Sequence, residues 1–199
     1  MEPYWEKDLV INNREINYKG IFKVEELMST INRALEAKKY TKREKKTEEL
    51  VTESGRRTHI EMRPFKEGTT YITLMLKIRI NLNNVKETIT EFNGFRQKFQ
   101  VGDVNVVFDA WFLTDYKNRW GMRPFYYFMK GVINKYIFNL KEEHHFHHNL
   151  VHDTAYIYAQ VKKLFHSYAG DKSKPVSEEE VRAQMEEEIK NESKVTKRK

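Results

Sequence analysis

The chain has no cysteine among its 199 residues, only four prolines and eight glycines, and no long apolar run. The lack of cysteine excludes a disulfide framework, a thiolate nucleophile and thiolate-bound zinc. No stretch approaches the roughly 20 apolar residues that a membrane-spanning helix needs. Neither a glycine-rich phosphate loop nor a Gly-x-Ser-x-Gly motif is present. We therefore predict a cytoplasmic protein that spans no membrane, is not an enzyme, has no catalytic residues and binds no cofactor.

Charge, by contrast, is plentiful and unevenly placed. Charged residues make up 33% of the chain, mean hydropathy is −0.79 and the net charge is +7. Residues 171–199 hold eight acidic and eight basic residues, which cancel, so the whole excess lies in residues 1–170. A basic folded body favours anionic partners such as nucleic acid, a ribonucleoprotein or a membrane surface. We predict one domain over residues 1–170, followed by a linker, a short helix and a disordered basic end over 171–199.

The spacing of apolar residues predicts an α+β fold. We expect a strand and a helix at the start, a curled antiparallel sheet of about five to seven strands, a long C-terminal helix or helix pair packed on the sheet, and a short helical tail. The expected elements are a short strand at 16–20, a helix at 24–35, strands at 40–51, 57–63, 71–82, 85–92, 95–101 and 104–114, and helices at 124–140 and 150–168.

Turn residues and alternation set the limits of the strands. Asn93-Gly94 is a strong two-residue hairpin signal, and Gly102-Asp103 predicts a second tight turn. The strand at 104–114 is apolar on both faces, so we expect it to be covered on both. A carboxylate inside this strand needs a partner, and we predict that Asp109 pairs with Lys77 or Arg79 on a neighbouring strand.

The tail has its own helix signal. Ser177 and Glu180 form a capping box, with valines on either side of it in the positions of a hydrophobic staple. The residues Val181, Met185 and Ile189 then form a thin apolar stripe at helical spacing. We predict a helix that ends near residue 190, whose docking site is either its own body or a partner.

A run of cations follows the first predicted helix and resumes after the next strand. It comprises Lys38, Lys39, Lys42, Arg43, Lys45, Lys46, Arg56 and Arg57. Spaced cations of this kind suit a phosphate backbone and give salt-sensitive binding of nucleic acid. The same pattern also protects an exposed edge strand from pairing with another sheet. Both interpretations fit a charged strand at the edge of the sheet.

The connection between the last strand and the helix at 124–140 supplies a second candidate contact. Arg119, Trp120 and Arg123 could stack on bases or bind phosphate. The alternative is a structural corner in which Trp120 and Phe125 close the end of the core. The segment Asp115-Tyr-x-Asn-Arg-Trp-x-x-x-Pro-Phe125, with the strand-helix start before it, resembles a group of small uncharacterised archaeal α+β proteins. That resemblance implies no chemistry.

Five of the seven histidines lie between residues 144 and 152. His144, His148 and His152 are four residues apart and share one helix face, opposite the apolar stripe that includes Leu150 and Ile157. Three interpretations are open: an exposed stripe without a role, a partner-facing or pH-dependent patch, or a metal site. One helix face offers two ligands comfortably rather than four, and no Glu-x-x-His pattern accompanies the stripe.

The order of elements over residues 16–168 resembles the helix-grip shape of START-like ligand-binding proteins. That resemblance implies a carrier that holds an apolar ligand between sheet and helix, lined by residues such as Leu76, Ile78 and Phe128, although the second short helix of that shape is missing. We nevertheless predict a binding protein whose basic surface engages RNA or a ribonucleoprotein. A homodimer or scaffold subunit is a third alternative.

Overall fold

The structure, a computed structural model, describes residues 6–52, 55–69, 72–92, 95–114, 142–169 and 177–196. Six antiparallel strands form an open sheet in the order β1-β6-β5-β3-β2, and β4 pairs with an earlier part of β5. The strands are β1 (Glu6–Phe22), β2 (Glu44–Thr52), β3 (Gly55–Met62), β4 (Phe65–Glu67), β5 (Ile72–Phe92) and β6 (Phe95–Thr114). The helices are α1 (Val24–Ala37), α3 (Glu142–Ala169) and α4 (Glu178–Thr196). The predicted α+β class and the antiparallel sheet are confirmed.

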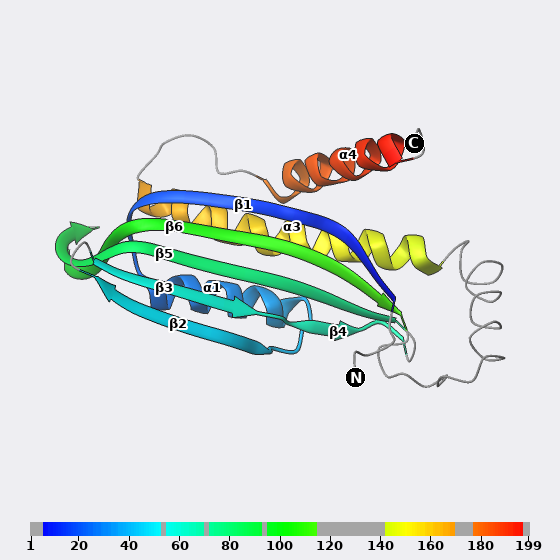
Figure 1. The fold of residues 1–199 in the computed structure, drawn as a ribbon. Helices are drawn as coiled ribbons and strands as arrows, with labels where there is room; N and C mark the ends of the chain where they lie inside the picture. Colours follow the sequence, from blue (N-terminus) through cyan, green and yellow to red (C-terminus); the bar gives the residue numbers. More distant parts are fainter. Residues whose placement is uncertain are drawn as a thin grey trace.

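The helices lie together on one side of the sheet (Figure 1). There α3 packs against β1, β6 and α1, while α4 packs against α3 and β1. The alternate residues of β5 that face these helices, from Ile72 to Leu82, are all buried. We call the other side, on which no described helix packs, the open face. None of the described helices is long and apolar enough to cross a bilayer.

β5 and β6 are much longer than the sequence predicted. They run for 21 and 20 residues and pair along almost their whole length, so the predicted turn at Gly102-Asp103 is wrong. A register shift between Asn83 and Lys86 lies opposite this point. A Cβ at Gly102 would come 2.8 Å from the backbone oxygen of Asn83, so the glycine marks a close approach of two strands.

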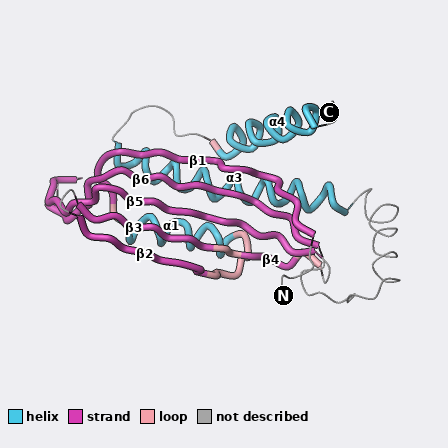
Figure 2. The backbone as a smooth tube through the Cα atoms, viewed as in Figure 1, coloured by secondary structure: helices cyan, strands magenta, loops and turns pink. Residues whose placement is uncertain are grey.

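β1 is also longer than predicted, because two irregularities hide its periodicity. Register shifts between Leu9 and Arg14 interrupt the alternation, and Val10 and Ile11 are consecutive yet both buried. Asn13 adopts a φ of 51°, in the left-handed region that asparagine tolerates. In the strand order of the sheet, β1 and β2 are the two edge strands (Figure 2).

Several local signals are confirmed. α1 begins at Val24, as its apolar spacing predicted, and α3 carries the predicted stripe with Ile157 and Val161 fully buried. The capping box of α4 forms in both directions: Ser177 N–H donates to Glu180 at 3.1 Å, and Glu180 N–H donates to Ser177 at 3.2 Å. The predicted helix at 124–140 and the Asn93-Gly94 turn lie outside the described residues.

Candidate functional site

A row of three amide side chains and one imidazole crosses the open face. Asn17 on β1, Asn105 on β6, Asn81 on β5 and His59 on β3 are direct cross-strand partners. Their neighbours one position earlier or later in each strand, such as Ile80, face the helices and are buried, so these four side chains point the other way. We call these four residues the amide row.

The amide row is held by hydrogen bonds among its members and by the carboxylate of Glu15 on β1, which accepts from Asn17 Nδ2 at 3.4 Å and from Asn105 Nδ2 at 3.3 Å. Asn105 Nδ2 donates to Asn17 Oδ1 at 2.7 Å, and Asn81 Nδ2 donates to Asn105 Oδ1 at 2.9 Å. His59 Nδ1 lies 2.5 Å from Asn81 Oδ1. Beside the row is a shallow pocket of about 350 Å³ lined by Asn17, Tyr18, Lys19, Asn83, Asp103, Val104 and Asn105.

A charged cluster adjoins the amide row. Arg79 Nη2 donates to Asp109 Oδ2 at 2.9 Å, and Asn13 N–H donates to Asp109 Oδ1 at 2.8 Å. The predicted partner of Asp109 is thus confirmed, and the ion pair explains how a carboxylate only 5% exposed sits among apolar residues. Arg79 also donates to Asn13 Oδ1 at 3.2 Å, which ties the arginine to the bulge in β1.

Cations outnumber carboxylates where β2, β3 and β5 meet. Arg63 donates to Glu61 at 2.7 Å, and Lys77 lies 3.9 Å from the same carboxylate. Burial acts to raise the pKa of Glu61, but the hydrogen bond and charge of Arg63, with Lys77 and Lys45, outweigh it and hold that pKa below its ordinary value. Several positive charges therefore converge on one carboxylate at this end of the open face.

The predicted cations lie at the β2 edge of the sheet, some before β2, some on β2 and some on β3. We call Lys39, Lys42, Arg43, Lys45, Lys46, Arg56 and Arg57 the basic edge. The ion pairs within it join exposed side chains: Lys42–Glu36 at 3.0 Å, Lys46–Glu48 at 2.7 Å and Arg56–Glu49 at 3.4 Å. Lys39, Lys45 and Arg57 are exposed and form no salt bridge with a described residue, although the charge of Lys45 acts on Glu61. β2 is an edge strand, as expected.

Lys38 points away from this surface, and its role in binding stays a prediction. Its ammonium faces α3, where it lies 3.7 Å from Asp153 Oδ1, 3.2 Å from His152 Nδ1 and 4.5 Å from the centre of the Tyr156 ring. The side chain is only 19% exposed. The ammonium of Lys38 is therefore compensated by α3 and points away from the exposed cations of the basic edge.

Asp153 is the centre of a polar cluster that the sequence analysis did not predict. Lys66 on β4 approaches Asp153 Oδ2 at 2.9 Å, whereas Lys38 approaches the other carboxylate oxygen. The Tyr40 hydroxyl is buried next to this cluster without a hydrogen-bond partner among the described residues. Burial first, then the charge of Asp153 and the proximity of its carboxylate as an acceptor for the phenolic proton, raise the pKa of Tyr40 above its ordinary value. The signal for this cluster in the sequence was Asp153 itself, a carboxylate within an otherwise apolar stripe of the predicted helix.

The histidine stripe faces α4. His152 Nε2 lies 3.4 Å from Glu178, and His148 Nδ1 lies 3.5 Å from Glu186. The side chain of His144 lies outside the described residues, and the described ones contain no group of three side chains placed to hold a metal ion. Arg119, Trp120 and Arg123 likewise lie outside the description, so the second predicted contact stays a prediction.

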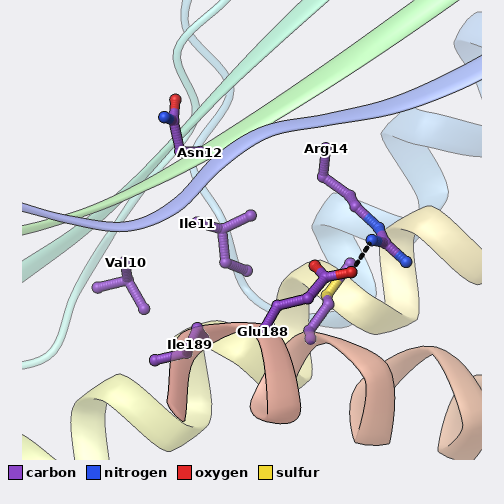
Figure 3. Close-up of a pocket in the computed structure, with 7 residues that line it drawn as sticks. Val10, Ile11, Asn12, Arg14, Glu188 and Ile189 are labelled. Carbon is purple, nitrogen blue, oxygen red and sulfur yellow. Dashed lines mark hydrogen bonds and ion pairs between the residues drawn. The ribbon is translucent and has the colours of Figure 1, made fainter. Parts of the chain in front are cut away.

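α4 docks on the body of its own chain. Val181 and Met185 are 1% exposed, and Arg14 on β1 donates to Glu188 at 2.6 Å and to Gln184 at 3.1 Å. Figure 3 shows Arg14 and Glu188 pointing toward one another and joined by their hydrogen bond, and both residues line a cavity of about 30 Å³. A cavity of that size holds little more than one water molecule, so the junction of β1 and α4 is a packed contact rather than a ligand site.

Comparison with protein-family models, with curated proteins and with solved structures found no match. The function therefore has to be argued from the surface itself. The basic edge can exchange weak ion pairs for phosphate contacts, and the amide row can donate and accept hydrogen bonds. The amide row lies on the side of the sheet that no described helix covers, and the basic edge borders it there through Lys46 and Arg57.

Proposed function

We propose that the chain is a non-enzymatic binding protein that engages RNA, alone or within a ribonucleoprotein, through the basic edge. The observation that carries this proposal is the set of exposed cations at the β2 edge of the sheet, from Lys39 before β2 to Arg57 on β3, of which Lys39, Lys45 and Arg57 form no salt bridge with a described residue. Exposed cations spaced along one edge match the spaced charges of a phosphate backbone. The proposed RNA contact does not include Lys38. A second contact stays a prediction, through Arg119, Trp120 and Arg123.

The ion pairs of the basic edge do not oppose this function. Each joins two side chains that are at least 40% exposed, and such pairs contribute roughly 0–1 kcal/mol to stability. A phosphate that displaces Glu36, Glu48 or Glu49 therefore disrupts little. Each new phosphate contact releases counterions, which favours binding at low salt.

The experiment is the salt dependence of binding to a single-stranded RNA of about twelve nucleotides, followed by fluorescence anisotropy. We expect Lys45→Glu with Arg57→Glu to weaken binding by at least about tenfold and to reduce the slope of log K against log salt by about 1.4. The control, Lys98→Glu with Lys163→Glu, changes the net charge equally with exposed residues outside the basic edge. Equal weakening by both variants would show general charge attraction and contradict a specific edge.

The alternative is a helix-grip carrier, in which a curled sheet holds an apolar ligand against a helix. Its expected lining residues Leu76 and Ile78 are 1% and 0% exposed, so their side chains border no void wide enough for water. Phe128 lies outside the described residues. The packing of the described core therefore favours the binding surface over the carrier. An apolar molecule that co-purifies with the protein and is identified by mass spectrometry would reverse that preference.

A further inference from the structure

We infer that the amide row reads the 2′-hydroxyl groups of single-stranded RNA that crosses the open face from the basic edge, so that the protein prefers RNA to DNA. This inference rests on the proposed function and assigns the sugar contact to the amide row. His59, the last residue of the row, lies directly opposite Glu48 of β2, so the row reaches the basic edge.

The residue types in the row are not what strand formation favours. Asparagine is depleted in strands, because its side chain competes for backbone hydrogen bonds. Here three asparagines occupy directly opposite positions on β1, β6 and β5. A solvent-facing sheet position needs only a polar side chain, and threonine or lysine would form the strand better. The row therefore indicates a role beyond folding.

The row keeps hydrogen-bonding capacity for a ligand. A carboxamide has two N–H donors and two acceptor lone pairs. Asn81 uses one N–H for Asn105 and one lone pair for His59, which leaves one donor and one acceptor position unused by the described residues. A 2′-hydroxyl is both donor and acceptor and matches that pair. Because the amides hold one another in place, they are ordered before RNA binds.

Cations lie on both sides of the row, where a backbone crossing the strands needs them. On one side, the adjacent row of the open face holds Arg79 and Lys46 together with Glu15 and Glu61; on the other side, Lys19 and Arg57 lie in one row with Asp103. The shallow pocket of about 350 Å³ opens beside Asn17 and Asn105, and its lining combines amides with a lysine and a carboxylate. Such a lining suits a sugar-phosphate unit better than an apolar ligand.

The test compares three single strands of one sequence: RNA, 2′-O-methyl RNA and DNA with uracil in place of thymine. The 2′-O-methyl strand keeps the charge and loses only the hydroxyl donor. We expect the wild-type protein to bind RNA about tenfold more tightly than either of the other strands, since hydrogen bonds of this kind are worth factors of a few each. Asn81→Ala and Asn17→Ala should each reduce that preference while the salt dependence stays unchanged.

The matched control is Asn32→Ala, which removes an amide from α1 on the helix side of the sheet and should leave the preference intact. Equal affinity for all three strands would overturn this inference and leave RNA binding by the basic edge standing. A preference that survives both Asn81→Ala and Asn17→Ala would overturn it too. Absence of binding to every strand at low salt would remove the proposed function and this inference together. Circular dichroism of each variant establishes that it is folded.

Discussion

The ammonium group of Lys66 lies 2.9 Å from Oδ2 of Asp153, although 87 residues separate the two in the chain. Lys38, at the end of α1, approaches the other carboxylate oxygen at 3.7 Å. One carboxylate that is only 5% exposed thus joins β4, α1 and α3. Both lysines are partly shielded from water, so each depends on this carboxylate for its charge compensation.

We therefore predict that Asp153→Asn lowers the free energy of unfolding by about 1–3 kcal/mol, because it leaves two partly buried ammonium groups without a counter-charge. Chemical denaturation followed by circular dichroism measures the loss. The control is Glu36→Gln, which removes the exposed partner of Lys42 and should cost less than about 0.5 kcal/mol. Similar losses for both variants would contradict the buried role of Asp153.

Tyr40 makes the second prediction, which concerns pH. Burial and the charge of Asp153 raise the pKa of Tyr40, so the folded protein holds the phenolic proton more firmly than the unfolded chain. The stability that comes from holding this proton is complete below the pKa of tyrosine in the unfolded chain, about 10. It is lost as pH rises from there toward the higher pKa of Tyr40 in the folded protein. Tyr40→Phe should therefore lose less stability than the wild type between about pH 8 and pH 10.5.

At neutral pH the same substitution removes a buried hydroxyl that has no hydrogen-bond partner among the described residues. We expect Tyr40→Phe to be neutral or stabilising by up to about 1 kcal/mol there. Urea unfolding at the two pH values measures both effects. Parallel pH profiles for wild type and variant would show that Tyr40 does not cause the alkaline loss.

The third prediction concerns the docking of α4. Met185 is 1% exposed, so Met185→Asp places a charge in the contact and should release the helix. Hydrogen exchange should then become fast across α4 and remain slow in β5 and β6, because α4 adds only Val181 and Met185 to a buried core that is otherwise formed mainly by the sheet, α1 and α3. Glu187→Asp, an exposed position on α4, is the control. Slow exchange in α4 of Met185→Asp would mean that the helix is held by other contacts, such as Arg14–Glu188.

Local signals in the sequence predicted local structure well. The apolar spacing located α1 and α3, and Ser177 with Glu180 located the start of α4. The need to compensate a carboxylate in an apolar strand identified Arg79 as a partner of Asp109. These inferences succeeded because each depends on residues close in sequence or on one strong energetic requirement.

Features that depend on distant parts of the chain were not predictable. The bulges of β1 concealed a long strand, and Gly102 resembled a turn because the close approach to Asn83 is not visible in the sequence. Lys38 looked like its basic neighbours, and its partner Asp153 lies far along the chain. Similarly, the amide row brings together residues from four strands, and only the register of the sheet aligns them.

The most direct test of RNA binding is the affinity of the purified protein for a single-stranded RNA of about twelve nucleotides at about 50 and about 200 mM salt. We predict tight binding at the lower salt that falls by one or more orders of magnitude at the higher, as several phosphate contacts on the basic edge require. Absence of binding at the lower salt would contradict RNA binding by this surface.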